Sequence, residues 1–440
     1  MAPPPTDPHL SGLGPGAGEH AEWKETGRQR MNEKFQEYRD IALKILQPSP
    51  ADLEHGLALH EDALVVEPYG SAPQTSVDVD VLHAAQEAGA ANEEVFDLHR
   101  DMIRTGAAVD PVEKEEFMDA WNTAGVTCIV QGAGSLDQDP ERHFKSVARF
   151  TYLTDSIGDL IVRGVKPNDI IQAKVQGKKC LYMALCNVPL PLKWNSVEGE
   201  LRYIQTFFHL GVRMMHLTYN RRTMLGEGCA EPTDGGLSDL GRAAIAEMNR
   251  VGVIVDVAHS SHKTSLEAAQ LSKRPVVASH TACTTLSDHC RCKTDEVLRA
   301  IADTNGIIGI CCIPGFLGRT GDISAFLDHI DYTVKTVGIE HVAIGPDRWH
   351  RSAGKSAGNK KLIHPIEGRW EPLWPSDSTH NLAEWRTSEQ LMSMAWTNWP
   401  LFTVGLVQRG YSDQDIRKIV GENVLRVLRD ALPEYEITKD

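Results

Sequence analysis

Short apolar segments recur along most of the chain, and each is followed by a stretch with helical spacing of apolar residues. The segments are almost continuously apolar rather than alternating, which is typical of parallel strands covered on both faces. Helical stretches such as LSDLGRAAIAEMNRV carry apolar residues at i, i+3, i+4 and i+7. The pattern predicts eight strands, over residues 63–68, 126–133, 178–186, 212–220, 251–259, 275–282, 306–314 and 341–347.

Alternating strands and helices in this number predict an α/β protein with a (β/α)8 TIM barrel. The alternative is an open, doubly wound sheet. No glycine-rich dinucleotide loop follows any predicted strand, and this favours the barrel. In a barrel the chemistry lies at the carboxyl ends of the strands, so the residues at those ends are the candidates for function.

The two ends of the chain differ from this repeating pattern. Residues 1–21 are rich in Pro and Gly and are predicted to form a disordered arm. Residues 22–50 are charged and are predicted to form an N-terminal helical extension. Residues 51–440 are predicted to form a single barrel domain, which includes C-terminal helices and a polar loop from Arg348 that we expect to act as a lid.

Charge and cysteine content narrow the class of protein. The chain has 440 residues and a net charge of −15, which argues against nucleic acid as a partner. The first twenty residues lack the features of a secretory signal, and no apolar run is long enough for a membrane span. Nine cysteines without a repeated spacing fit reduced thiols better than a disulfide framework. We therefore expect a cytoplasmic protein without a membrane partner.

Metal-ligand side chains occur at several predicted strand ends. Two successive strands end in His259 and His280, and others end in Cys186 and Asp347. Imidazole, thiolate and carboxylate are ordinary ligands of zinc and similar divalent ions. The pattern predicts a metal site at His259, His280 and Cys186, with Asp347 as general base or weak ligand. In the structural alternative Cys186 is a small buried residue and Asp347 caps a turn.

Six motifs between about residue 178 and the C-terminus resemble one known family. They are LGVRMMHLTYN, GLSDLGRAAIAEMNRVGVIVDVAHSS, RPVVASHTA, RCKTD, LDHIDYTVKTVGIEHVAIGPD and GENVLRVL. On these motifs the chain resembles the renal (membrane) dipeptidase family, metallopeptidases with an amidohydrolase-type barrel. The resemblance implies a metal-dependent barrel that hydrolyses amide bonds, and it implies a homodimer. In that family two zinc ions share a bridging Glu.

The resemblance assigns roles to four residues of this chain. His259 and His280 match the family's metal ligands on the fifth and sixth barrel strands. Arg291 matches the arginine that binds the substrate carboxylate, and Asp347 matches the aspartate of the eighth strand.

The same comparison shows departures from the family's pattern. Tyr69 and Ser71 stand where the first strand should carry its His-x-Asp metal ligands. The bridging Glu falls near Cys186, and the histidine of the fourth strand falls at Tyr219. The first metal site is therefore expected to be lost, which leaves a mononuclear centre.

We expect a metal-dependent, amidohydrolase-like enzyme that hydrolyses an amide or peptide bond in a small carboxylate-bearing substrate. The expected cofactor is one divalent ion, zinc, with manganese or iron as alternatives. Asp347 and Tyr219 are the predicted catalytic residues, and Arg291, Tyr69 and Asn220 are predicted to bind substrate. Two other functions stay open: a non-hydrolytic metal-dependent decarboxylase, lyase or isomerase, and a catalytically dead binding scaffold.

Overall fold

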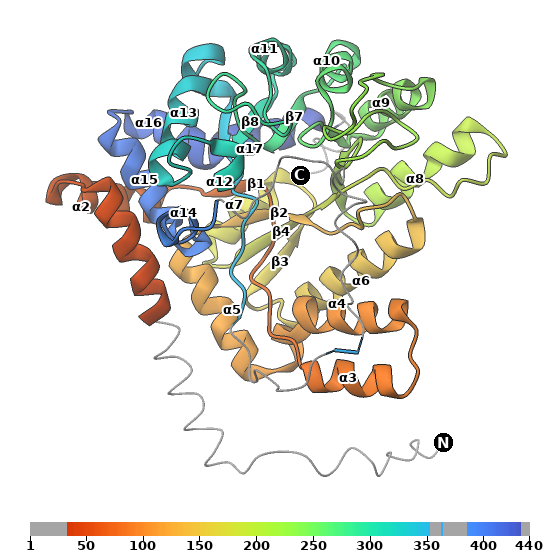
Figure 1. The fold of residues 1–440 in the computed structure, drawn as a ribbon, viewed down its shortest axis with the longest axis horizontal. Helices are drawn as coiled ribbons and strands as arrows, with labels where there is room; N and C mark the ends of the chain where they lie inside the picture. Colours follow the sequence, from red (N-terminus) through yellow and green to blue (C-terminus); the bar gives the residue numbers. More distant parts are fainter. Residues whose placement is uncertain (1–32, 353–361, 364–384, 433–440) are drawn as a thin grey trace.

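The protein is built on one parallel sheet that curves into a barrel and is surrounded by helices (Figure 1). The computed structural model describes residues 33–352, 362–363 and 385–432. The predicted disordered arm and most of the predicted lid lie outside these residues. The strands are β1 (Val66–Gly70), β2 (Cys128–Gly132), β3 (Ile161–Gly164), β4 (Lys179–Leu185), β5 (Val212–His216), β6 (Ile254–Asp256), β7 (Val276–Thr281), β8 (Ile307–Ile310) and β9 (Val342–Ile344).

Eight strands follow one another in the order β1-β2-β4-β5-β6-β7-β8-β9, and all of their pairings are parallel. They coincide with the eight predicted strands, and the TIM-barrel prediction is confirmed. Closure is not complete, since within the described residues no ladder joins β9 to β1. The extra strand β3 pairs with β4 outside this path. It was not predicted because it has four residues, of which only the first and last are buried.

Helices connect successive strands and cover the outside of the barrel (Figure 1). A helix over residues 33–46 lies within the predicted extension. The others are α2 (Pro50–Asp62), α3 (Val79–Glu87), α4 (Asn92–Val109), α5 (Pro111–Ala124), α6 (Pro140–Ser156), α7 (Pro167–Val175), α8 (Val197–His209), α9 (Asp239–Val251), α10 (His262–Leu271), α11 (Asp295–Asp303), α12 (Pro314–Leu317), α13 (Ile323–Val337), α14 (Ser388–Ser393), α15 (Trp399–Gln408), α16 (Asp413–Arg417) and α17 (Asn423–Ala431). Short 3-10 turns cover Ile339–His341 and Trp396–Asn398, and a π-helical turn covers Lys418–Glu422.

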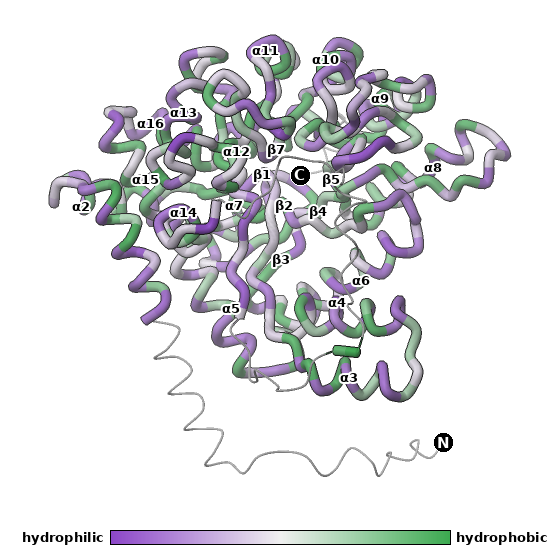
Figure 2. Tube along the Cα trace, in the orientation of Figure 1, coloured by the Kyte–Doolittle hydropathy of each residue, from purple (hydrophilic) through white to green (hydrophobic). Residues whose placement is uncertain are grey.

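Local chemistry sets where the helices around the site begin. The hydroxyl of Ser238 accepts a hydrogen bond from the Gly241 amide at the start of α9, and Ser261 does the same for Thr264 at the start of α10. Along these helices hydrophilic and hydrophobic segments alternate (Figure 2), as expected for helices that cover a sheet on one side only. None of the described helices is long and apolar enough to cross a membrane.

The strands carry one apolar face into the barrel and another toward the helices. Side chains such as Val66, Tyr182, Met214 and Ile254 form the inner cluster, and Val424 of α17 packs against it. The outer face packs against the surrounding helices in a larger cluster. At the carboxyl ends of the strands the inner face becomes polar, and this is where the candidate site lies.

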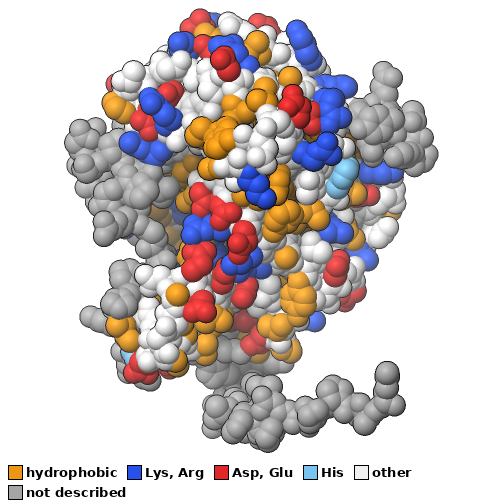
Figure 3. Space-filling model, turned by 90° about the vertical axis from the view of Figure 1, so that its right-hand side faces the viewer, with side chains coloured by type: hydrophobic (Ala, Val, Ile, Leu, Met, Phe, Trp, Pro, Cys, Tyr) orange, Lys and Arg blue, Asp and Glu red, His pale blue; other side chains and the backbone are white. Residues whose placement is uncertain are grey.

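Ion pairs join neighbouring helices at the surface. Asp97 of α4 lies 2.8 Å from both Lys145 and Arg149 of α6, and Asp101 lies 2.5 Å from Arg149. On the face shown in Figure 3, acidic and basic side chains lie intermixed among hydrophobic ones. Exposed pairs of this kind contribute little stability each, so the helices depend mainly on their apolar faces.

A carboxyl group is buried between the barrel and the C-terminal layer. Glu67 of β1 is fully buried on the outer face and accepts a hydrogen bond of 2.9 Å from the indole of Trp396. Burial raises the pKa of Glu67 well above its usual range, against the opposing effect of the indole hydrogen bonds. The folded protein therefore holds this proton to a higher pH than an exposed glutamate does.

The buried Glu67 predicts a pH-dependent stability. In the unfolded chain Glu67 releases its proton as the pH rises through about 4.3, whereas the folded protein keeps it. The folded state then binds more protons, so the free energy of unfolding falls with rising pH. Glutamine has no proton to release, so Glu67→Gln should not lose this stability. We expect the unfolding temperature of Glu67→Gln, measured by calorimetry, to rise relative to that of the wild type as the pH increases from about 5 to about 8. The exposed Glu61 supplies the control, since Glu61→Gln should track the wild type at every pH. A Glu67→Gln difference that does not change with pH would contradict the assignment.

Candidate metal centre

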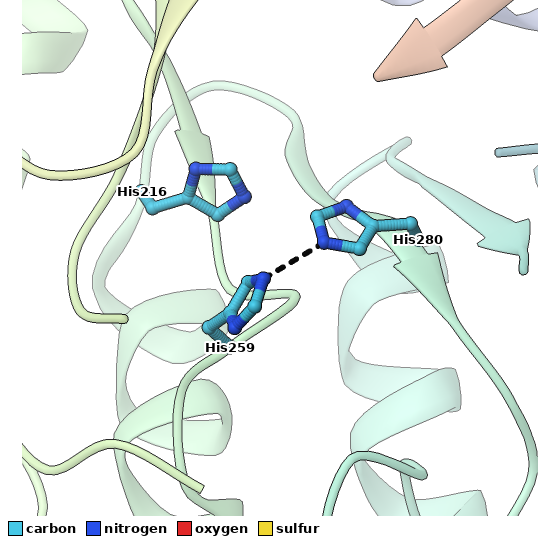
Figure 4. Close-up of side chains that lie close together, drawn as sticks. All are labelled: His216, His259 and His280. Atoms are coloured by element: carbon cyan, nitrogen blue, oxygen red, sulfur yellow. Dashed lines mark hydrogen bonds between the residues drawn. The ribbon is translucent and has the colours of Figure 1, made fainter. Parts of the chain in front are cut away.

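Three buried histidines lie together at the carboxyl ends of neighbouring strands (Figure 4). His216 is the last residue of β5, His259 follows β6, and His280 lies in β7. One ring nitrogen from each lies within 4.8 Å of the others. Because β5, β6 and β7 are consecutive parallel strands, their carboxyl ends bring the three rings to one edge of the sheet.

His259 and His280 face each other directly. Their Nε2 atoms are 2.9 Å apart. Burial lowers the pKa of both rings well below the usual histidine value, and the nearby charge of Arg291 lowers it further. Both rings are therefore neutral at neutral pH, and each carries a single proton.

The hydrogen bonds behind these two rings fix where that proton lies. Nδ1 of His259 is 2.7 Å from the side-chain oxygen of Asn220, which can only accept. Nδ1 of His280 is 2.8 Å from the hydroxyl of Ser279, whose own proton goes to Asp256. Both rings therefore carry hydrogen on Nδ1, and two Nε2 lone pairs point at each other.

His216 is held by the strand on its other side. Its Nδ1 donates to the carbonyl of Leu185 at 3.0 Å. Its Nε2 lies 3.0 Å from Oδ2 of Asp256 but has no aligned hydrogen-bond partner among the described residues. One ring nitrogen of His216 lies within 4.8 Å of ring nitrogens of His259 and His280, and Nε2 of His216 also borders the Asp256 carboxylate.

Asp256 is the fully buried anion of this group. Its Oδ1 accepts from the amides of Ala258 at 2.9 Å and Ser279 at 3.2 Å, and its Oδ2 accepts from the Ser279 hydroxyl. Burial by itself would raise the pKa of Asp256. The adjacent His216 and the Ser279 hydroxyl outweigh that effect and hold the pKa well below its usual range.

This arrangement fits a divalent metal ion. Two facing lone pairs repel unless a cation lies between them, and neutral imidazole nitrogens are ordinary ligands of zinc-like ions. Bonds of the usual length to one tetrahedral ion would place two ring nitrogens about 3.3 Å apart. The observed 2.9 Å between His259 and His280 is close to that separation. His259 and His280 would hold the ion, with His216 as a third nitrogen donor.

Tyr69 and Cys186 lie on one side of the histidines. The Tyr69 ring stacks on His280 with ring centroids 4.6 Å apart and meets His216 edge-on at 4.8 Å. Its hydroxyl is 3.0 Å from the Cys186 sulfur. Burial raises the pKa of the Cys186 thiol. Cys186 therefore lies against Tyr69 rather than in the histidine cluster, and its role as a metal ligand stays a prediction.

Tyr219 and Asn220 lie on the side of His259. The Tyr219 ring stacks on His259 with centroids 4.1 Å apart, and burial raises the pKa of its hydroxyl. Asn220, which the sequence analysis assigned to substrate binding, directs its side-chain oxygen at His259 and accepts the 3.6 Å contact of Cys229. Its observed contact orients His259, and contact with substrate stays a prediction.

Arg291 is buried beside the metal centre. Its guanidinium donates to the carbonyls of Ala258 and His280 and lies 3.4 Å from Nε2 of His259. Its hydrogen-bond partners in the described part of the chain are thus two carbonyls and an imidazole, not a carboxylate. A buried guanidinium with such partners can take a carboxylate from a ligand.

Asp347 follows β9 and lies at the same end of the barrel. It is half-buried and has a positive φ of 53°, a conformation that only a few non-glycine residues adopt. Burial raises the pKa of Asp347 to about 6, while the charge of Arg291 acts to lower it. Its roles as general base or ligand stay predictions.

His216 and Asp256 were missed by the sequence analysis. It placed the ends of the fourth and fifth barrel strands near Asn220 and His259, but these strands, β5 and β6, end at His216 and Asp256. These two residues are direct partners in the β5–β6 register. The available signal was the period of two in VRMMH, which places His216 on the same face as the inward-facing Met214.

Comparisons with known proteins agree with this architecture. The model of the membrane dipeptidase family, peptidase family M19, matches residues 161–355. An uncharacterized dipeptidase of Schizosaccharomyces pombe is 34% identical over 161 residues, which cover 35% of this chain and 39% of that protein. Dipeptidase aclJ of Aspergillus oryzae is 30% identical over 242 residues, which cover 54% of this chain and 49% of that protein. The chain thus spans less than half the length of these curated relatives.

A solved structure extends the likeness over the whole barrel. The structure of an amidohydrolase from Pseudomonas aeruginosa superposes with a TM-score of 0.62 at 25% sequence identity. The superposition covers 86% of this chain and 98% of that one. Residues 161–355 are therefore similar to the membrane dipeptidase family, peptidase family M19, and the chain has an amidohydrolase-like barrel.

Proposed function

We propose that the protein is a metal-dependent hydrolase that cleaves an amide or peptide bond in a small, carboxylate-bearing molecule such as a dipeptide. The observation that carries the proposal is the pair of unprotonated Nε2 atoms of His259 and His280, 2.9 Å apart. His216 adds a third nitrogen. Imidazole ligands favour zinc, with manganese or iron as alternatives.

A single ion fits the cluster better than two. At the strand-one positions where the family carries two metal ligands, the chain has Tyr69 and Ser71, and neither is a carboxylate or an imidazole. Tyr69 packs its ring against His280 and His216. An aromatic side chain thus lies beside the histidines where a second set of ligands would be needed.

The residues around the cluster supply the other functions that amide hydrolysis needs. A divalent ion bound there would polarise the amide carbonyl and acidify water. Asp347, with a pKa of about 6, is ionised at neutral pH and can accept a proton. Arg291 can bind the substrate carboxylate, and the Tyr219 hydroxyl, which stays protonated, can donate to a developing oxyanion.

The remaining expectations are part of the same proposal. We expect a small-molecule substrate rather than nucleic acid or a membrane as the partner, because the net charge is −15. A cytoplasmic location is supported by the nine cysteines, all of which are free thiols. A homodimer rests on the family resemblance alone.

One observation favours a second candidate, a non-hydrolytic decarboxylase, lyase or isomerase. The Tyr69 ring and the Cys186 thiol fill one side of the histidine cluster, which narrows the space for an attacking water. The products separate the two candidates. Hydrolysis releases an amine and an acid from an amide, whereas decarboxylation releases carbon dioxide and isomerisation conserves mass.

Metal content tests the single-ion site. We expect about one divalent ion per chain in the purified protein by elemental analysis, because three ring nitrogens form one ligand set. The double variant His259→Ala, His280→Ala should lose it. His209→Ala, at an exposed position at the end of α8, should keep it. Two ions per chain would contradict the mononuclear site, and no ion after reconstitution would contradict metal dependence.

Substitution of Asp347 tests the base. On a panel of dipeptides, Asp347→Asn should lower kcat by about 100-fold or more in the metal-loaded protein, because the amide cannot accept a proton. Metal content, measured in parallel, should stay at the wild-type level. A variant that keeps its kcat would remove Asp347 from the mechanism.

Substitution of Arg291 tests the charge on Asp347. In the metal-free protein Arg291→Gln should move the pKa of Asp347 above about 6, because the guanidinium acts to lower it. Arg291→Lys, which keeps the charge, should leave the pKa closer to the wild-type value. Carboxyl carbon NMR across a pH series measures the difference, and equal values in all three proteins would contradict the coupling.

A further inference from the structure

A buried carboxylate and a hydroxyl lie directly behind one of the three histidines. The chain of contacts runs from Asp256 to the hydroxyl of Ser279 and from there to Nδ1 of His280. All three residues are fully buried. They occupy neighbouring strands, since Asp256 ends β6 and Ser279 and His280 lie in β7.

We propose that Asp256 and Ser279 are positioning residues that keep the proton of His280 on Nδ1 and so keep its Nε2 open to a cation. The effect on metal binding rests on the proposed function. The position of the proton does not, because it is a property of the metal-free protein.

The direction of the hydrogen bonds is set by the carboxylate. Oδ1 of Asp256 accepts from two backbone amides, and Oδ2 accepts the single hydroxyl proton of Ser279. The Ser279 oxygen can then only accept from His280. A hydrogen bond to a charged acceptor is roughly twice as strong as one between neutral groups, so this orientation is held firmly.

Without this arrangement the histidine pair could satisfy itself. If His280 carried its proton on Nε2, that proton would point at Nε2 of His259, 2.9 Å away. The two rings would then form an ordinary neutral hydrogen bond, and both Nε2 atoms would be unavailable. Asp256 and Ser279 therefore determine whether His259 and His280 hydrogen-bond to each other or keep both Nε2 lone pairs free for a cation.

The same carboxylate oxygen also borders His216. Nε2 of His216 lies 3.0 Å from Oδ2 of Asp256, and the two residues are register partners on β5 and β6. One buried anion thus lies beside His216 directly and beside His280 through Ser279. For His280 the anion lies behind the ring, on the side away from Nε2, where it raises the basicity of the ring and compensates the charge of a bound cation.

The backbone holds Ser279 in place. Gly309 and Gly345 lie against the carbonyl oxygen of Ser279, and a Cβ at either position would overlap that oxygen. Because both residues are glycines, their chain segments approach Ser279 more closely than a residue with a side chain would allow. This close packing fixes the backbone position from which the Ser279 hydroxyl reaches Asp256 and His280.

The imidazole nitrogens report the proton directly, so the first measurement needs no variant. In the metal-free wild type, long-range proton–nitrogen NMR of the histidine rings should show His280 protonated on Nδ1. A His280 protonated on Nε2 would overturn the proposal outright.

Asp256→Asn offers a test that preserves shape. The Oδ1 position accepts from the amides of Ala258 and Ser279, so the asparagine must keep its oxygen there and place its NH2 at the Oδ2 position. The NH2 would donate to Ser279, whose hydroxyl would turn its proton toward His280. We expect the His280 proton to move to Nε2 and zinc affinity, measured by competition with a chromophoric chelator, to fall by about 10- to 100-fold.

Two substitutions at Ser279 form a matched pair, Ser279→Ala and Ser279→Thr. The alanine variant removes the acceptor for Nδ1, so it should shift His280 toward the Nε2 proton and weaken zinc binding. The threonine variant keeps the hydroxyl and should restore both. Thr281→Val is the matched control, since Thr281 is a buried hydroxyl residue on the same strand that donates to the Arg291 carbonyl. It should leave the His280 proton on Nδ1.

The outcomes separate this inference from the proposed function. If the proton moves as expected but no protein in the series binds metal, the proposed function fails and the positioning role stands. If zinc affinity falls in Ser279→Ala while the proton stays on Nδ1, Ser279 acts only on packing and the inference is wrong. Failure of threonine to rescue would also overturn it.

Discussion

The site depends on one buried charge, the carboxylate of Asp256. A carboxylate without water around it is costly unless hydrogen bonds and a partner surround it. Two backbone amides, the Ser279 hydroxyl and His216 together provide that environment. Because each of these groups must face Asp256, the orientations of β5, β6 and β7 at their carboxyl ends are coupled. The histidine cluster follows from that coupling.

Tyr69 and Cys186 lie on the other side of the histidines, at the ends of β1 and β4. Tyr69 lies on β1, stacks on His280 and contacts Cys186 through its hydroxyl. An aromatic ring and a thiol thus lie on this side of the histidines, and burial raises the pKa of both groups. The histidine nitrogens therefore lie on one side of the site, at the ends of β5 to β7. The other side is a largely apolar wall formed by Tyr69 of β1 and Cys186 after β4. Such a wall strengthens every electrostatic interaction inside the site.

The C-terminal layer supports this arrangement from outside. Glu67 alternates with inward-facing neighbours on β1 and meets Trp396 on the outer face of the strand. Trp396 and Trp399 are fully buried, and α15 packs along α2. The strand that carries Tyr69 is thus fixed on its outer face by residues more than three hundred positions away. This packing fixes the carboxyl end of β1 and thereby the position of the Tyr69 ring beside the histidines.

Sequence alone determined the broad architecture and part of the site. Near-continuous apolar segments separated by amphipathic helices are a local property, so eight strands and a barrel could be predicted from it. The pairing of His259 with His280, and the presence of Arg291 and Asp347, followed from strand ends and from motifs in fixed order. Strand β3 was missed because its four residues are only half covered and carry no clear apolar pattern.

Only the tertiary structure decided what the histidines do. His216 and Asp256 lie forty residues apart, and nothing in either local segment shows that they are register partners across two strands. The proton positions on His259 and His280 depend on Asn220, Ser279 and Asp256, which meet only once the sheet has formed. Local pattern specifies which strands form, because that depends on near neighbours in the chain. The chemistry of the site depends on which buried donors face which acceptors, and the folded barrel alone sets that.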